Sequence, residues 1–372
     1  MKALYLTRWC EVGTVADTIK FGEVPPPTTV PVKSEVLIEV KASAINVDDI
    51  ALSQDSAAGG WFFHGRRPSD AIPVVGGMEY AGVVLAVGPE VTKLKVGDRV
   101  CGVQDVSLQK NPGTWAEQTM APEKGIVLIP ADFDISFVQA ASVGMAAFVT
   151  GDMYKRAKLL STGNHRCLVV GASGGLGTFM VQLLSRREGG NVHVVGVCSG
   201  ENADTVRRAG AHDVVDYKVG PFGQQLANAE AFDVVFDFVG GIDTERNAQE
   251  VLKRGGKFIT AVGPRQGMGD RVLTCSEWYQ WACGLTCRLL KSACCCCCTK
   301  FTYDMGGGLT LKAEDFNEWV VNQGIRATIA MEVPFEEAPL REALRRVASR
   351  HTGGKVVINM EAGVDSGIGE TK

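Results

Sequence analysis

Three glycines spaced three residues apart stand between an apolar strand and an apolar helix in the stretch "CLVVGASGGLGTFMVQLL". They are Gly171, Gly174 and Gly177. Because glycine has no side chain, the backbone can approach a pyrophosphate, and the helix start offers N–H groups and the positive end of its dipole. The pattern predicts a turn that binds a dinucleotide. A purely structural tight turn stays open, because a glycine triplet is a weak signal by itself.

Other proteins with glycine-rich turns fit this stretch less well. A P-loop would continue with Gly-Lys-Ser/Thr, and "GLGTF" lacks those residues. A short-chain dehydrogenase would place a Tyr-x-x-x-Lys pair after the glycines, whereas Tyr154 and Lys158 precede them. A methyltransferase can use a similar turn and stays open.

The end of the next strand bears on the choice of cofactor. An NAD site carries an acid about 20 residues beyond the glycines, where it binds the ribose hydroxyls. Here Ser199 stands near that place and leaves room for a 2′-phosphate, with Arg207 and Arg208 following. Glu201 and Asp204 oppose this interpretation. We expect NADPH rather than NADH.

The elements around the glycine turn predict a doubly wound parallel sheet. Short β-branched runs alternate with helical stretches such as "DTERNAQEVLKR" up to about residue 325, which is the pattern of consecutive βα units. Residues 1–135 are β-rich, with short strands between turn residues. The final part has its own strand–helix–strand pattern and is expected to return to the first domain. We therefore predict domains at 1–135 with 326–360 and at 136–325, followed by a disordered tail at 361–372.

Composition excludes several functional classes. The 372 residues carry a formal net charge of −4 with no basic stripe, so a nucleic-acid partner is not expected. No run of 18 apolar residues could form a membrane span. The start "MKALYLTRW" has the pattern of a strand rather than a targeting peptide. We expect a cytoplasmic protein, with a mitochondrial or plastid location at a membrane surface as the alternative.

The order of these parts resembles the medium-chain dehydrogenase/reductase superfamily, over about residues 1–360. The motifs that carry the resemblance are "ASAINVDDI", "GGMEYAGVVLAVGPEVTKLKVGDRV", "GTWAEQ", "GASGGLG", "VVDY", "FDFVGG", "LKRGGKFITAVG" and "HTGGKVVI". The resemblance implies an α/β protein with a GroES-like catalytic domain and a Rossmann cofactor domain.

Zinc-dependent members of that superfamily hold a catalytic zinc with a cysteine and a histidine. Here Asn46 and Met78 stand at those places, and both are poor zinc ligands. The four-cysteine structural zinc loop is also absent from the sequence. The chain therefore resembles the zinc-free quinone oxidoreductase (zeta-crystallin-like) branch, and we expect no metal. The stretch "VCSGENADTVRRAGAHDVVDY" is especially similar to the reticulon-4-interacting protein 1-like NADPH oxidoreductases.

The resemblance implies hydride transfer from NADPH to a quinone or a related conjugated carbonyl. It implies a pyrophosphate at the glycine turn, a 2′-phosphate and an adenosine on the next strands, and a nicotinamide near the domain junction. Asn46 would lie near the nicotinamide as a positioning residue. The cofactor-binding residues that it implies are Gly171, Ser173, Gly174, Gly175, Leu176, Gly177, Ser199, Tyr217, Gly263 and Lys355.

One departure from the family concerns the proton donor. Several members carry a tyrosine and, two residues later, an arginine just after the asparagine motif, and those places fall on Ala51 and Ser53. Quinone reduction needs less acid help than enone reduction, so the departure favours quinones. An enone or 2-enoyl reductase and a non-catalytic NADPH-binding subunit of a larger complex stay open.

Two segments offer further hypotheses. In the loop "GGWFFHGRRPSD", Trp61 and Phe62 could line a substrate pocket, although buried anchoring is the simpler interpretation. Residues 276–298 combine an amphipathic helix with the five cysteines Cys294–Cys298, which are expected to enter a strand and pack there. Thr274 and Glu277 could form the capping box of this helix, and its polar face carries Glu277, Gln280, Gly284, Arg288 and Lys291. Peripheral membrane contact through 276–298 is the functional alternative. A homodimer or a place in a complex also stays open.

Overall fold

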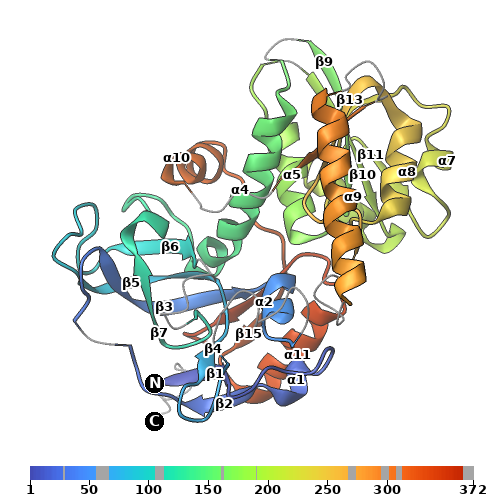
Figure 1. The fold of residues 1–372 in the computed structure, drawn as a ribbon. Coiled ribbons are helices and arrows are strands. Elements are labelled where there is room, and N and C mark those ends of the chain that lie inside the picture. The colour runs from blue at the N-terminus through green and yellow to red at the C-terminus, as the bar shows by residue number, and fades with distance from the viewer. Residues whose placement is uncertain are drawn as a thin grey trace, which may run out of the picture.

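The computed structural model describes residues 1–27, 30–55, 67–104, 113–160, 163–189, 191–266, 274–294, 301–306 and 312–362. Two lobes, each built on its own β-sheet, are joined by a long helix, α4 (Phe137–Ala157) (Figure 1). The Ser136 hydroxyl caps α4 by accepting a hydrogen bond from Gln139 N at 3.2 Å, which explains why the helix begins there. Among the described residues, no helix has the length and apolarity to cross a bilayer.

The first lobe contains a seven-stranded sheet in the order β15-β16-β3-β5-β6-β8, with β7 paired to β3, and a small sheet β2-β1-β4. The C-terminal strands β15 and β16 thus lie beside the N-terminal strands, and β16 runs antiparallel to β3. The strands are β1 (Lys2–Leu6), β2 (Lys20–Glu23), β3 (Glu35–Ile45), β4 (Val74–Val75), β5 (Glu79–Val87), β6 (Arg99–Val103), β7 (Gln118–Pro122), β8 (Ile126–Leu128), β15 (Ile329–Pro334) and β16 (Lys355–Asn359). The helices are α1 (Val15–Thr18), α2 (Val47–Leu52), η1 (Glu123–Gly125) and α11 (Glu337–Ala348).

The second lobe is the predicted parallel sheet, with its six strands in the order β11-β10-β9-β12-β13-β14. The chain leaves β9 to one side for β10 and β11 and returns on the other side with β12, so the order reverses beside β9. The strands are β9 (Asn164–Val170), β10 (Asn191–Cys198), β11 (Asp213–Asp216), β12 (Phe232–Asp237), β13 (Leu252–Thr260) and β14 (Phe301–Met305). The helices are α5 (Gly175–Ser185), η2 (Gly200–Asn202), α6 (Ala203–Arg208), α7 (Phe222–Gln225), α8 (Ile242–Val251), α9 (Cys275–Cys294), α10 (Ala313–Phe316) and η3 (Asn317–Asn322). The predicted fold class, a GroES-like domain with a Rossmann domain, is confirmed.

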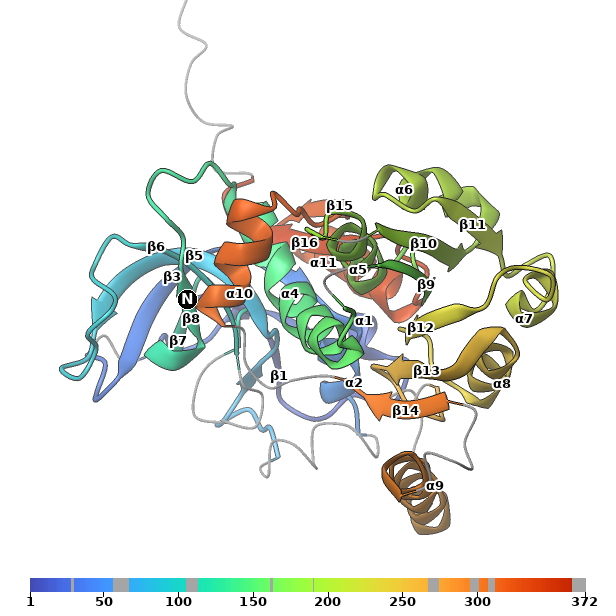
Figure 2. The same cartoon turned by 90° about the horizontal axis from the view of Figure 1, so that it is seen from above.

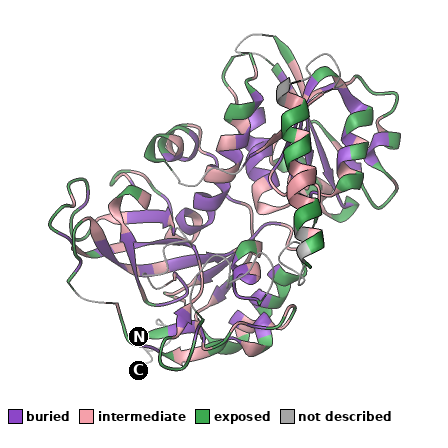
Figure 3. Cartoon of the chain, viewed as in Figure 1, coloured by how far each residue is buried: buried purple, intermediate pink, exposed green. Residues whose placement is uncertain are grey.

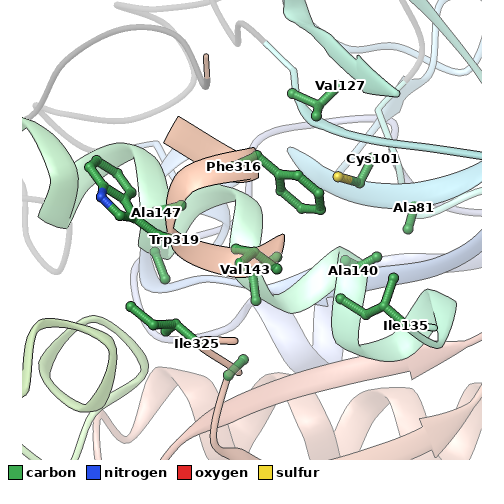
Figure 4. Close-up of a cluster of buried hydrophobic side chains, with 14 of the residues drawn as sticks. Ala81, Cys101, Val127, Ile135, Ala140, Val143, Ala147, Phe316, Trp319 and Ile325 are labelled. Atoms are coloured by element: carbon green, nitrogen blue, oxygen red, sulfur yellow. The ribbon is translucent and has the colours of Figure 1, made fainter. Parts of the chain in front are cut away.

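Buried side chains fill both faces of the parallel sheet and the junction between the lobes (Figure 3). At the junction, Phe316 and Trp319 pack against Val143 and Ala147 of α4 and against Cys101 of the first lobe (Figure 4). This shared apolar cluster fixes α4 and α10 against the first sheet, and it therefore sets how the two sheets face each other.

Two sequence expectations differ from the structure, and a third is not tested by it. The helix predicted over "DTERNAQEVLKR" ends at Val251, and Leu252 already belongs to β13. Cys294 is the last residue of α9 rather than part of a strand, and the remaining cysteines, 295–298, lie outside the described residues. The tail beyond residue 362 also lies outside them.

The predicted start of α9 is confirmed, and its predicted polar face is partly turned to solvent: Gln280 and Lys291 are exposed, whereas Arg288 is not. Thr274 and Glu277 form the expected capping box, with Thr274 N donating to Glu277 Oε2 at 3.0 Å and Glu277 N donating to Thr274 Oγ1 at 3.3 Å. Arg288, assigned to the solvent face, instead pairs with the buried Glu245 at 2.7 Å. Figure 2 shows α9 beside β14, the outer strand of the sheet.

Candidate active site

The glycine turn lies where β9 passes into α5. Gly171 has a φ of +79°, which favours glycine, and a Cβ on Gly177 would lie 2.1 Å from the carbonyl oxygen of Gly171. Gly174 is the N-cap residue of α5, and no side chain there bonds to the first N–H groups of the helix. Ser173 lies in the same turn, and Gly175 and Leu176 begin α5. The first turn of a helix leaves backbone N–H groups unpaired, so the turn fits a phosphate group.

A lysine from the first lobe crosses this turn. Lys355 is the first residue of β16, and a Cβ built on Gly175 would lie 2.6 Å from Lys355 Cδ. Glycine is therefore needed at 175 to let the lysine stem pass over the start of α5. The family resemblance implies that Lys355 approaches the nicotinamide half of the cofactor, and in the structure its stem lies beside Gly175 of the glycine turn.

Beyond the turn, the Lys355 ammonium joins a buried polar cluster. Lys355 Nζ lies 2.6 Å from Glu79 Oε2 and donates a second hydrogen bond to Asn46 Oδ1 at 2.6 Å. Glu79 accepts a further hydrogen bond from Met145 N at 2.7 Å. A buried charge is tolerated only when it is paired and hydrogen-bonded, and Glu79 meets both conditions.

Both the nitrogen and the oxygen of the Asn46 side-chain amide form hydrogen bonds. Its Nδ2 donates to Asp49 Oδ2 at 3.2 Å and to Glu79 Oε2 at 3.3 Å, while Oδ1 accepts from Lys355. Its backbone N–H also donates to Asp49 Oδ2 at 2.7 Å, so Asn46 caps α2. We predicted that Asn46 would point into the cleft as a positioning residue. In the structure its amide bonds to protein partners, and the hydrogen bond that its Oδ1 accepts from Lys355 positions the lysine.

Asp49 is the cluster member that sequence reasoning missed. It is buried, and no other described group forms a hydrogen bond with its Oδ1. Burial raises its pKa to about 7, although the hydrogen bonds from Asn46 and the charge of Lys355 act in the opposite direction. The Asn-x-x-Asp spacing of a capping box was the available signal.

An apolar cluster adjoins these polar groups. Met78 is buried against Leu52 and Met145. Thioether and isobutyl groups do not supply the nitrogen, thiolate or carboxylate ligands that Zn²⁺ prefers. Among the described residues, no group of three or more His, Cys, Asp or Glu side chains could hold a metal ion.

The proposed adenosine end of the site lies at the ends of β10 and β11. The Ser199 hydroxyl is buried and accepts a hydrogen bond from Asn202 Nδ2 at 2.9 Å. Tyr217 follows β11 and its side chain is half-exposed. Its backbone N–H donates to Cys198 O at 3.2 Å, which places the Tyr217 backbone beside the end of β10, where Ser199 follows. Lys218 comes next and pairs with Glu201 at 3.0 Å.

Two polar residues here were not predicted, and two expected cations are engaged elsewhere. Asn202 and Lys218 lie close to Ser199 through the contacts above, whereas Arg207 pairs with Asp204 at 3.2 Å and Arg208 donates to Thr205 at 3.1 Å. Asn202 is the third residue after Ser199, which is the local spacing of a side-chain turn and could have been noticed.

At the other end, Gly263 follows β13 in a turn that a buried pair holds. Thr260 Oγ1 donates to Asp237 Oδ2 at 2.8 Å and accepts from Gly263 N at 2.9 Å, which ties the ends of β12 and β13 together. Burial raises the pKa of Asp237. A Cβ on Gly263 would lie 3.9 Å from both Met305 Cε and Trp281 Nε1, so α9 and β14 border this turn.

Two predicted pocket residues are not tested by the structure. Trp61 and Phe62 lie outside the described residues. Ala51 is partly exposed, and the buried Ser53 hydroxyl donates to Asp49 O at 2.8 Å, which closes the end of α2. Neither can replace the tyrosine and arginine of the relatives as a proton donor.

Two family models match the chain. The "Alcohol dehydrogenase GroES-like domain" matches residues 32–131, and the "Zinc-binding dehydrogenase" family matches residues 209–358. The human protein "NAD(P)H oxidoreductase RTN4IP1, mitochondrial" is 30% identical over 337 residues, which covers 88% of this chain and 82% of the relative. The Arabidopsis thaliana "NADPH-dependent alkenal/one oxidoreductase, chloroplastic" is 27% identical and covers 88% of this chain and 72% of the relative.

Solved structures share the fold. The quinone oxidoreductase from Coxiella burnetii superposes with a TM-score of 0.73 at 20% identity and covers 97% of this chain and 99% of that structure. The chain belongs to the medium-chain dehydrogenase/reductase superfamily. It is an oxidoreductase of the medium-chain reductase type, which uses a nicotinamide cofactor.

Proposed function

We propose that this protein is a zinc-independent, NADPH-dependent oxidoreductase that transfers hydride to a quinone or a related conjugated carbonyl compound. The observation that carries the proposal is the single site formed by the glycine turn of one lobe and the Lys355–Asn46–Glu79 cluster of the other. An apolar cluster around Met78 adjoins this site, at the place that a metal ligand occupies in zinc-dependent relatives.

The residues of this chain divide the binding task between them. Gly171, Gly174 and Gly177 let the backbone approach the pyrophosphate, and the start of α5 offers N–H groups to it. Lys355 adds a positive charge beside the same turn. Gly263 would border the nicotinamide half, since the Thr260–Asp237 hydrogen bond holds its turn beside β12.

The NADPH preference rests on the group around Ser199. A hydroxyl and the amide of Asn202 replace the acid that would repel a 2′-phosphate, and Lys218 can turn from Glu201 to that phosphate. Tyr217 would lie along the adenosine. Ser199, Asn202 and Lys218 are neutral or positive groups near the place where NAD-selective enzymes carry a carboxylate, and the nearby Glu201 is paired with Lys218.

When bound, NADPH supplies the hydride, and the protein orients the reactants and excludes water. Asn46 and Glu79 fix the Lys355 ammonium at the lobe junction, where a positive charge would stabilise the negative charge that develops on a reduced carbonyl oxygen. No tyrosine stands at positions 51 or 53 to protonate the product. This favours quinone acceptors, whose reduced form takes protons from water.

Conjugated enones and alkenals are the second candidate substrates. They are favoured by the name of the Arabidopsis thaliana relative and by that of the Aspergillus terreus relative "Trans-enoyl reductase pgmF", which is 34% identical over 55% of this chain and 55% of its own length. An enone requires a proton on carbon after hydride transfer, and Ala51 and Ser53 stand where several family members carry a tyrosine and an arginine.

The proposed compartment and partners rest on the relatives and on the surface of α9. The names of two relatives contain "mitochondrial" and "chloroplastic", which supports the organellar alternative to a cytoplasmic location. Tyr279 and Leu290 of α9 expose their side chains, which is compatible with peripheral membrane contact through 276–298. The homodimer and complex-subunit alternatives stay predictions.

Oxidation of NADPH in the presence of a panel of quinones and enones, followed at 340 nm, tests the proposed function. We expect turnover with at least one conjugated acceptor and no requirement for added metal. Tight NADPH binding with no oxidation by any acceptor in the panel would contradict the enzyme proposal and favour a non-catalytic nucleotide-binding subunit.

A further inference from the structure

Two buried carboxylates share one buried ammonium at the junction of the lobes. Lys355 forms an ion pair with Glu79, and Asn46 Nδ2 bridges Glu79 and Asp49 by donating to both. With both acids ionised, the cluster would carry a net negative charge away from solvent. Because a single cation can offset only one of the two charges, the cluster becomes neutral when one acid takes up a proton.

Asp49 is the acid that holds this proton most readily. Glu79 has an ammonium and a backbone N–H as partners, whereas Asp49 has only neutral donors from Asn46, and its Oδ1 lacks a partner among the described groups. The other charged groups near Asp49 are the exposed Asp48 on the same turn, which disfavours ionisation, and Lys355. Arg350, beyond α11, acts on Asp48.

The same Lys355 connects Asp49 to the glycine turn. Its stem passes over Gly175, and its ammonium contacts Asn46, which in turn contacts Asp49. A pyrophosphate at the start of α5 would bring negative charge close to this cluster and would attract the Lys355 ammonium. Both effects disfavour the ionised form of Asp49, and both therefore favour its protonation.

We propose that Asp49 takes up a proton from solvent when NADPH binds, so that cofactor affinity falls as the pH rises. The inference rests on the cofactor site of the proposed function. In this step the enzyme with ionised Asp49 binds one NADPH and up to one proton. The product is the NADPH complex in which the Asp49 carboxyl is neutral. Asp49 acts through Asn46 and Lys355 and is a positioning residue rather than a catalytic one.

Isothermal titration calorimetry of the wild-type chain with NADPH tests the proton uptake directly. Titrations at pH 7.5 in buffers of different ionisation enthalpy give the number of protons bound per NADPH. We expect a fraction of one proton taken up. Fluorescence titration from pH 6 to pH 9 should show NADPH affinity weakening by about threefold to tenfold, since a tenfold change corresponds to one pKa unit.

The variant Asp49→Asn separates this effect from the titration of the cofactor itself. Asparagine keeps an oxygen that can accept the Asn46 hydrogen bonds, but it cannot bind the proton. The 2′-phosphate of NADPH also titrates near pH 6, and it does so equally in wild type and variant. The matched control Asp48→Asn removes the same charge from the exposed neighbour and should retain the proton uptake.

The outcomes separate the two proposals. Loss of proton uptake in Asp49→Asn and its retention in Asp48→Asn would support the inference. Zero uptake by the wild type, or equal uptake by wild type and Asp49→Asn, would overturn it while leaving the NADPH site standing. Failure of the wild type to bind NADPH at any pH would instead refute the proposed cofactor site.

Discussion

Lys355 Nζ and Glu79 Oε2 lie 2.6 Å apart although 276 residues separate them, and their side chains are only 6% and 0% exposed. The pair connects β16 to β5, and Glu79 connects further to α4 through Met145 N. Among the described residues, Lys355 of β16 therefore contributes the cation that pairs with Glu79. Because the lysine stem also crosses Gly175, stability of the first lobe and the form of the glycine turn depend on the same residue.

The variant Lys355→Met should destabilise the protein by about 3–5 kcal/mol, because it leaves the buried Glu79 carboxylate without a cation. Chemical unfolding measures the loss. The double variant Lys355→Met with Glu79→Gln should regain much of it. As a control, Lys155→Met removes an equally short but half-exposed ion pair with Asp315 and should cost about 0–1 kcal/mol. Equal losses in the two single variants would contradict the role of burial.

The variant Asp49→Asn should stabilise the folded protein at alkaline pH. Because the pKa of Asp49 is raised to about 7 in the folded state, the folded chain holds this proton between about pH 4 and pH 7, where the unfolded chain has lost it. The contribution of Asp49 to stability therefore falls as the pH rises through that window and stays low above it. The difference amounts to at most about 4 kcal/mol.

Unfolding curves of wild type and Asp49→Asn at pH 5, 7 and 9 check this sign. We expect the advantage of the variant to increase from pH 5 to pH 7 and then level off. An advantage that is the same at all three pH values would show that Asp49 is ionised across the range in the folded protein.

NADPH should bind at least tenfold more tightly than NADH, since one well-placed phosphate contact contributes more than about 1.4 kcal/mol. Ser199→Asp should reverse the preference by placing a carboxylate beside the ribose. Lys218→Met should weaken NADPH binding and leave NADH binding unchanged, because only the 2′-phosphate would draw Lys218 from Glu201. Fluorescence titrations with both nucleotides measure all three, and equal wild-type affinities would refute the preference.

The local parts of this fold were predictable, and the long-range pairs were not. Strands such as β3 and β9 and the turn at Gly171 follow from residue patterns within ten or so positions. The capping box of α9 at Thr274 and Glu277 is equally local. In contrast, Arg288 was assigned to solvent, because its partner Glu245 lies 43 residues away in the sequence.

The candidate site divides in the same way. The glycine turn could be placed from spacing alone, and Lys355 and Asn46 were brought to it by the family resemblance. Their mutual hydrogen bond spans 309 residues, and no periodicity within the chain encodes it. Asp49 needed the structure for a different reason: burial, rather than its sequence neighbours, determines its protonation.

The purified protein should contain no stoichiometric zinc, and chelators should leave NADPH oxidation unchanged. Met78 packs with Leu52 and Met145 where a metal ligand would be needed, and Asn46 is already bonded to Lys355. Elemental analysis together with assays before and after dialysis against a chelator measures this. A zinc-dependent alcohol dehydrogenase treated in parallel is the positive control. One zinc per chain, with activity lost on its removal, would contradict the zinc-free assignment.

Replacement of Cys294–Cys298 by alternating valine and serine should leave NADPH oxidation intact. Cys294 ends α9 on the outer side of β14, and the glycine turn and Lys355 belong to other elements of the fold. Free cysteines behave as small hydrophobic residues, so the run is expected to pack rather than to react. Turnover lost in a folded variant would assign the run to the chemistry. Recovery with membranes is the second measurement, made on the cysteine variant and on the double variant Tyr279→Ser with Leu290→Ser. Loss of membrane recovery in the cysteine variant alone would favour thiol lipidation over contact through the exposed side chains of α9.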